Sequence, residues 1–96
     1  MRDISVVVPV KNEAENIIKL IQEINYALNQ INKDFEIICV DDASTDNTLE
    51  LLESAKKEFL NLRILAHSKN SGQSKSIHSG VKYSNGNLIV ILDGDG

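Results

Sequence analysis

Runs of branched apolar residues alternate along this chain with segments in which apolar residues recur every three or four positions. The continuous runs are typical of strands that are buried on both faces. They predict strands at residues 4–10, 35–40, 62–66 and 88–92. The segments with helical spacing lie between these strands, so the chain alternates between strand and helix from its first element to its last.

Three helices are predicted by this spacing. The first begins at Asn12, which is placed to cap it, and has an apolar stripe made of Ile17, Ile18, Ile21, Ile24, Leu28 and Ile31. The second is capped by Ser44 or Asp46, and its buried face is Leu49, Leu52, Ala55 and Phe59. The third covers residues 72–83, is weakened by its serines, and has Ile77 and Val81 at helical spacing. A turn is expected at residues 85–87.

This order of elements predicts an α/β fold. Strands that alternate with helices through short connections form a parallel sheet with right-handed crossovers, and the helices cover its faces. We therefore expect a three-layer, Rossmann-like arrangement that forms one domain over residues 1–96.

Polar clusters follow all four predicted strands. They are residues 9–13, 41–46, 69–72 and 93–96. Ligands of open parallel sheets bind outside the carboxyl ends of the strands, so four clusters at one rim indicate a binding site there. Each cluster alone could also be ordinary turn or helix-capping chemistry.

The last cluster, Asp93-Gly94-Asp95-Gly96, predicts a cation site. Residues two apart in an extended chain point to the same side, so Asp93 and Asp95 would face each other. Two carboxylates roughly 5 Å apart repel by about 3 kcal/mol at an effective dielectric constant near 20. Oxygen ligands suit Mg²⁺ or Mn²⁺, which would also hold a phosphate. A simple turn is the alternative for this segment.

Composition excludes several classes of protein. The formal net charge of −4 on 96 residues argues against nucleic acid as a partner. The one cysteine, Cys39, lies in an apolar run and is expected in the core. No signal peptide and no run long enough to span a membrane is recognisable, so a cytoplasmic location is expected.

Fingerprints of other nucleotide-binding folds are missing from the sequence. There is no Gly-x-Gly-x-x-Gly after the first strand and no phosphate loop ending in Gly-Lys-Ser/Thr. His67 and His78 match no metal-binding spacing, and we expect them on a loop and on a helix surface.

Four motifs together resemble the front of a family 2 glycosyltransferase with the GT-A fold. They are Val-Val-Val-Pro-Val-Lys-Asn-Glu-Ala-Glu-Asn at 6–16, Val-Asp-Asp-Ala-Ser-Thr-Asp-Asn-Thr at 40–48, Asn-x-Gly at 70–72 with Gly80 beyond it, and Leu-Asp-Gly-Asp-Gly at 92–96. Within the family the chain is most similar to the dolichyl-phosphate mannosyltransferase-like branch. The resemblance implies the sheet order three, two, one, four. Ser76 departs from the alanine that the family often has there, and Lys11 from an aromatic residue.

The resemblance also implies roles for residues at and just after the ends of the first two strands. Pro9, Lys11 and Glu13 would line a nucleotide pocket, with Glu13 near the ribose or the base. Val40 and Asp42 would contact the base, whose ring N–H groups need an acceptor such as a carboxylate.

The same resemblance makes Asp93 and Asp95 the catalytic and metal-binding pair. Together with Gly94 they would hold the ribose, the sugar and a Mg²⁺ or Mn²⁺ ion, with Asp95 the more direct ligand. The donor would be a UDP- or GDP-linked sugar. The acceptor would be a polyprenyl phosphate or a glycan, and transfer in this family is usually with inversion.

The sequence ends at Gly96, where such enzymes continue. We therefore expect a nucleotide-sugar-binding portion, truncated after the fourth strand, that is inactive by itself. Its last strand would be an exposed sheet edge. The full-length protein would act in the cytoplasm, with the cytoplasmic face of a membrane as a further location.

Other classes of protein remain open on the sequence. A haloacid-dehalogenase-like phosphatase would use Asp93 and Asp95, but it places this motif on its first strand. A receiver-like signalling module would use Asp41 and Asp42 as an acidic pair, but no aspartate follows the next strand. A non-catalytic nucleotide-binding module is the third alternative.

Overall fold

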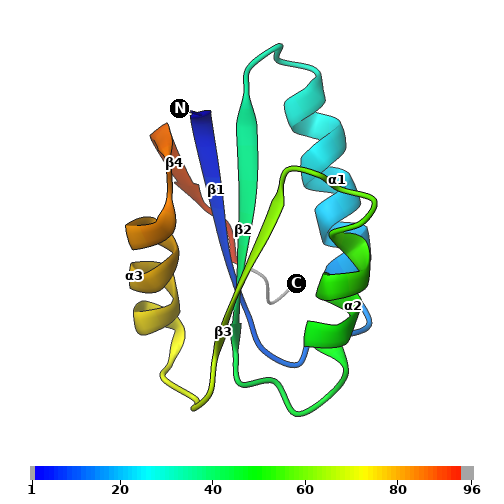
Figure 1. Cartoon of the computed structure of the whole chain (residues 1–96), viewed down its shortest axis with the longest axis vertical. Helices are drawn as coiled ribbons and strands as arrows, with labels where there is room; N and C mark the ends of the chain where they lie inside the picture. The colour runs from blue at the N-terminus through cyan, green and yellow to red at the C-terminus, as the bar shows by residue number, and fades with distance from the viewer. Residues whose placement is uncertain (1, 94–96) are drawn as a thin grey trace.

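The computed structural model describes residues 2–93 as a parallel sheet with helices on both faces (Figure 1). Its elements in chain order are β1 (Arg2–Val10), α1 (Ile17–Asn29), β2 (Phe35–Asp42), α2 (Thr48–Ala55), β3 (Leu62–His67), α3 (Gln73–Tyr83) and β4 (Gly86–Ile91). The predicted alternation of strands and helices is confirmed. Several strands are longer than predicted, and β4 begins at Gly86, where a turn was expected.

Strand β1 lies at the centre of the sheet, whose order is β3-β2-β1-β4. It pairs in parallel with β2 on one side and with β4 on the other. Ile4 to Val10 are all buried, which explains the unbroken apolar run. Pro9 is tolerated in this central strand because its nitrogen, which has no hydrogen to donate, lies beyond the end of β4. The Val7 oxygen faces β4, since it accepts from the Leu92 nitrogen, and the Pro9 nitrogen two residues later faces the same side.

The two faces of the sheet have cores of very different size. Helices α1 and α2 cover one face of the sheet and α3 covers the other (Figure 1). The larger core lies under α1 and α2 and includes Cys39, which is fully buried as expected. Burial raises the pKa of the Cys39 thiol to about 12, so it stays protonated. The core under α3 is small, with Val7, Ile38 and Val40 as its fully buried members.

Helix α3 approaches the sheet through small residues and not through Ile77 and Val81, the apolar pair at helical spacing. Ser76 and Gly80 are buried, whereas Ile77 is only partly buried and Val81 is exposed. A Cβ atom at Gly80 would lie 2.3 Å from a Val7 methyl carbon and 3.2 Å from a Val40 methyl carbon. The missing side chain therefore allows the helix to lie against β1 and β2.

The start and end of the first helix also differ from expectation. Helix α1 begins at Ile17, and Asn12 does not cap it. Asn12 instead has φ of 53° and braces the loop after β2, as described below. The stripe ends before Ile31, which is 48% exposed because the helix stops at Asn29.

Strand β4 forms an exposed edge of the sheet. Leu88, Ile89 and Ile91 are 58%, 37% and 48% exposed, so the prediction of burial on both faces is wrong within residues 2–93. The expectation of an apolar edge strand is confirmed. Among the helices of these residues, none is long and apolar enough to cross a membrane.

A buried carboxylate joins four elements at the amino ends of the strands. Glu36 on β2 is 1% exposed and accepts hydrogen bonds from Ser5 Oγ at 2.6 Å, Arg63 Nη1 at 2.9 Å and the Asn85 backbone nitrogen at 2.7 Å. Ser5 Oγ accepts in turn from the Gly86 nitrogen at 2.7 Å. Burial raises the pKa of the Glu36 carboxyl, but these bonds outweigh it and hold the pKa below the usual 4.5.

Replacing Gly80 tests the close approach of α3. We expect Gly80→Ala to lower the free energy of unfolding, measured by urea denaturation, by about 1–3 kcal/mol because the added methyl overlaps Val7. In the double variant with Val7→Ala, the loss in the free energy of unfolding should be smaller than the sum of the losses in the two single variants, because the clashing methyl is gone. Ser74→Ala on the exposed side of α3 is the control. Strictly additive costs would contradict this packing.

Replacing Glu36 tests the buried network. Because its pKa is lower in the folded chain, its stabilisation is complete above the unfolded pKa and is lost as the pH falls through the folded value. Glu36→Gln should cost about 2–4 kcal/mol near neutral pH, since it leaves buried donors unpaired. It should also flatten the fall in stability below about pH 4.5. Exposed Glu53→Gln is the control, and an equal pH dependence in both variants would refute the assignment.

Candidate functional site

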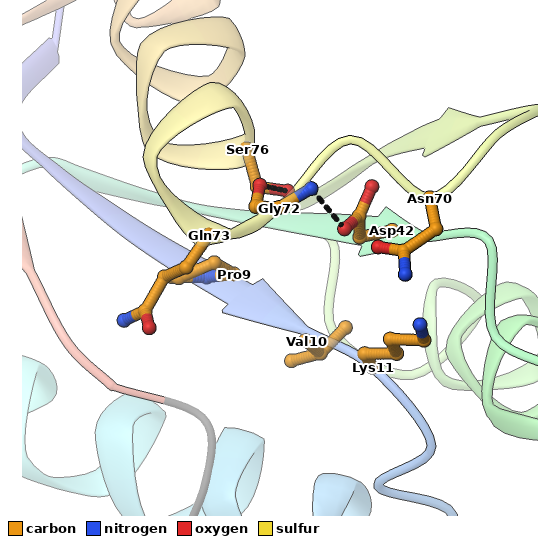
Figure 2. A pocket seen from close by; sticks show the side chains of 8 residues that line it. All are labelled: Pro9, Val10, Lys11, Asp42, Asn70, Gly72, Gln73 and Ser76. Carbon is orange, nitrogen blue, oxygen red and sulfur yellow. Dashed lines mark hydrogen bonds between the residues drawn. The ribbon is translucent and has the colours of Figure 1, made fainter.

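A pocket of about 260 Å³ opens at the carboxyl ends of β1 and β2, beside the start of α3 (Figure 2). It is lined by Pro9, Val10, Lys11, Asp42, Asn70, Gly72, Gln73 and Ser76. Three of the four polar clusters that the sequence singled out contribute to this lining. The crevice between parallel strands and a helix start is the place where ligands of such sheets bind.

Asp42 is the buried charge of this pocket. It is 5% exposed, and its Oδ1 accepts from the Ser71 backbone nitrogen at 2.8 Å and from His67 Nδ1 at 3.0 Å. Its Oδ2 accepts from the Gly72 backbone nitrogen at 2.8 Å. Burial raises the pKa of Asp42, but the three hydrogen bonds outweigh it and hold the pKa below the usual 3.8. The carboxylate is therefore ionised at neutral pH.

Gly72 allows the loop before α3 to reach Asp42. It has φ of 92°, a conformation that L side chains rarely adopt, and it precedes the first helical residue. Its oxygen accepts from the Ser76 nitrogen at 3.1 Å and from Ser76 Oγ at 3.1 Å, which closes the first turn of α3. The Asn-x-Gly motif thus shapes the wall of the pocket.

His67 is a site residue that the sequence interpretation missed. It was expected on a loop surface, but it ends β3 and its ring bridges Asp42 and Ser79, with Nε2 and Ser79 Oγ 2.9 Å apart. An ionised carboxylate only accepts, so Nδ1 carries a proton and donates to Asp42. The strand register pairs Asp42 with His67, and that register could have revealed the contact. His78 is exposed on α3 as expected.

The loop after β1 is braced by the loop after β2. Asn12 Oδ1 accepts from the backbone nitrogens of Thr45 and Asp46, at 2.8 and 3.2 Å. In return, the Asn12 nitrogen donates to Ser44 Oγ at 2.8 Å. Asp46 accepts from the Thr48 nitrogen at 3.0 Å, but Asn47 is the N-cap residue of α2, so the expectation of Ser44 or Asp46 as the cap is wrong. These contacts fix the backbone that carries Lys11.

The remaining residues expected in the pocket lie in different surroundings. Pro9 and Lys11 line it, but Val40 is fully buried in the core near Gly80 and is not part of the pocket lining. Glu13 follows Lys11 in the loop, and its backbone nitrogen donates to Thr48 Oγ1 at 2.9 Å. Its position is not part of the pocket lining.

Of the expected metal ligands, the structure describes Asp93. It lies exposed just beyond β4, next to the end of β1. Gly94 and Asp95 lie outside the described residues. Within residues 2–93 no group of three His, Cys, Asp or Glu side chains could hold a metal ion. The carboxylate oxygens of Asp93 and Asp95 have the chemistry that a hard divalent cation prefers.

Comparison with known proteins shows the family of the chain. The family model described as "Glycosyl transferase family 2" matches residues 5–96. The chain belongs to glycosyltransferase family 2. S. aureus TarS, in a structure with UDP-GlcNAc, is 31% identical, with a TM-score of 0.81. The match covers 97% of this chain and 26% of that one.

Two further glycosyltransferase structures show the same fold at lower identity. The Pyrobaculum calidifontis mannosyltransferase with GDP-Man and Mn²⁺ is 24% identical over 99% of this chain and 30% of that one, with a TM-score of 0.76. Glucosyl-3-phosphoglycerate synthase from Mycobacterium tuberculosis, with Mn²⁺, UDP and glucosyl-3-phosphoglycerate, is 24% identical over 98% of this chain and 34% of that one, with a TM-score of 0.77. The chain thus spans about a third or less of each of these three structures. The expected GT-A-like fold is confirmed.

Family membership does not favour the phosphatase or receiver-like alternatives. The structure adds a physical reason against the receiver. Asp41 and Asp42 are neighbours in β2, so their side chains point to opposite faces of the sheet. Asp41 bonds to Ser44 at the start of the next loop, whereas Asp42 bonds to the loop before α3. In this family member they do not form an acidic pair.

Asp42→Asn tests the structural role of the buried carboxylate. The amide has one acceptor oxygen in place of two, so at least one of the three donors loses its partner. We expect a loss of about 2–3 kcal/mol in the free energy of unfolding. Hydrogen exchange at the Ser71 and Gly72 amides should accelerate more than exchange in α1. Glu50→Gln, at an exposed position of α2, is the control. Unchanged exchange at the Ser71 and Gly72 amides would contradict the assignment.

Proposed function

We propose that residues 1–96 form the nucleotide-sugar-binding portion of a single family 2 glycosyltransferase domain. The observation that carries the proposal is the pocket at the rim of the sheet, with an ionised, buried Asp42 in its wall and Lys11 at its mouth. A carboxylate accepts the ring N–H of a base, and a lysine balances phosphate charge. Some solved structures of similar fold were determined with UDP, UDP-GlcNAc or GDP-Man, which supports a UDP- or GDP-linked sugar as donor.

The pocket residues receive separate roles in this proposal. Asp42 accepts from the base, and Pro9 supplies an apolar wall beside it. Lys11 and Glu13 lie on the braced loop after β1, and we place Glu13 toward the ribose. Val40 keeps the floor rigid from within the core. Because Asp42 is held by three donors before any ligand arrives, binding requires little reordering of this side chain.

Asp93 and Asp95 are proposed as the catalytic pair and as the ligands of a Mg²⁺ or Mn²⁺ ion, with the Gly94 backbone against the sugar or ribose. Asp93 follows the strand beside β1, on the same rim as the pocket. A divalent ion there would neutralise the charge that develops on the leaving diphosphate. Two of the similar glycosyltransferase structures contain Mn²⁺, which supports this donor set.

We also propose a polyprenyl phosphate or a glycan as acceptor, transfer with inversion, and a place in the dolichyl-phosphate mannosyltransferase-like branch of the family. The full-length protein would work in the cytoplasm or at the cytoplasmic face of a membrane. We expect the 96-residue chain to bind the donor and to transfer no sugar. Sugar transfer by the purified chain would overturn that last expectation.

Calorimetric titration tests the donor site. The folded chain should bind UDP or GDP more tightly with Mn²⁺ than without it. Asp95→Ala should abolish the gain from the metal, because it removes the proposed direct ligand. Glu53→Gln, on the exposed side of α2, should bind like the unmodified chain. Binding that is equal with and without Mn²⁺ would refute the metal role, and no binding by a chain shown to be folded would refute the donor site.

A further inference from the structure

The hydrogen bonds of Asp42 leave it one acceptor position for a ligand. An ionised carboxylate has about four acceptor positions, two on each oxygen. Oδ1 already accepts twice, from the Ser71 nitrogen and from His67 Nδ1. Oδ2 accepts once, from the Gly72 nitrogen. The carboxylate can therefore receive a single further N–H donor, on Oδ2.

The nucleobases differ in the number of adjacent donors that they present. Uracil and thymine have one ring N–H between two carbonyl oxygens. Guanine presents two adjacent donors, its ring N–H and its amino group, which match the two oxygens of a free carboxylate. Cytosine has an acceptor nitrogen at the position where uracil has its N–H. Of these bases, uracil and thymine need only the one position that Asp42 has left.

Donor groups lie on both sides of Asp42 in the pocket wall. Lys11 and Asn70 are at one side of the opening and Gln73 is at the other, toward α3 (Figure 2). An ammonium group and two amide groups can donate to the two carbonyl oxygens that flank the N–H of uracil. With the Lys11 ammonium or an amide N–H on each side of Asp42, the pocket can present the order donor, acceptor, donor. Guanine would need the order donor, acceptor, acceptor.

We propose that this site selects a uracil-type base over guanine, and that His67 is the residue that sets this selectivity. The inference rests on the proposed donor site and goes beyond it by naming the base. Structures of similar fold occur with UDP and with GDP-Man, so the fold does not decide between them. Here the decision lies in the saturation of Oδ1. A guanine amino group would find no free position on Oδ1, so guanine could not pair its two donors with the two carboxylate oxygens, a contact that uracil does not need.

His67 can act in this way because its ring is held at both nitrogens. Nδ1 lies 3.0 Å from Asp42 Oδ1, and Nε2 lies 2.9 Å from Ser79 Oγ on α3. The ring is only partly exposed, so water does not readily replace it at Oδ1. The Ser71 amide belongs to the backbone and stays in every variant. His67 is therefore the one side chain whose removal would free a position on Oδ1.

The experiment is calorimetric titration of the 96-residue chain with UDP, GDP and CDP in the presence of Mn²⁺. We expect UDP to bind at least ten times more tightly than GDP, and CDP to bind at least as weakly as GDP. Equal or tighter binding of GDP would overturn the inference and leave the proposed donor site intact. If a folded chain binds none of the three nucleotides, the proposed function fails and the inference fails with it.

Variants of His67 separate selectivity from mere support of the fold. His67→Leu opens a position on Oδ1, so the UDP preference should fall to about threefold or less, with GDP binding gaining relative to UDP. His67→Asn keeps a side-chain N–H donor near Asp42 and should restore most of the preference. Ser74→Ala, at an exposed position of α3 outside the pocket lining, is the control and should keep the ratio within about twofold.

A purely structural role for His67 makes a different prediction. In that case His67→Leu would weaken UDP and GDP by the same factor, the ratio would not change, and the specificity role would be refuted. Circular dichroism melting of each variant confirms that the titrated chain is folded. The selectivity ratio is the deciding measurement, because loss of stability alone does not reverse the order of two ligands.

Discussion

Two buried carboxylates of β2 hold helix α3 over the sheet, one at each end of the helix. Asp42 accepts from the backbone of Ser71 and Gly72, just before α3 begins. Glu36 accepts from the backbone of Asn85, just after α3 ends. The two residues are six positions apart in a strand, so their side chains point to the same face. Helix α3 itself packs through small residues and has little apolar surface to bury. These charged hydrogen bonds supply what its packing lacks.

The same arrangement explains where the countercharges lie. Residues 60–92 contain no aspartate or glutamate, yet they include Arg63 and His67 on β3. Both of these side chains pair with carboxylates of the neighbouring strand β2. The unit made of β3, α3 and β4 therefore depends on β2 for its buried polar partners. Glu36 also holds the residue just before β4, since it accepts from the Asn85 nitrogen, and the other end of β4 leads to Asp93.

Asp42 joins this structural role to the chemistry of the site. A side chain that only bound ligand would be free to turn, whereas Asp42 is fixed by three donors of the protein itself. Each of these donors occupies one acceptor position of the carboxylate, so fewer positions remain for a ligand. Structures of similar fold were determined with UDP and with GDP-Man, and the way a carboxylate such as Asp42 is held offers a route to different base preferences.

The sequence by itself determined the elements, the parallel alternation and the rim on which the site lies. These follow from local periodicity and from the rule that strand ends meet on one edge, and that rule is enough to place Pro9, Lys11 and Asp42 together. Burial and side-chain partners were decided by tertiary structure. Helix α3 turned its small residues inward because Gly80 permits an approach that Val81 would prevent. Asn12 does not cap α1 as expected, and its side-chain oxygen instead accepts a hydrogen bond from the loop after β2. His67 and Glu36 gained their roles only from the strand register, which brings residues 25 and 27 positions apart into contact. No local pattern encodes such pairs, because their energy comes from neighbours that are distant in the chain.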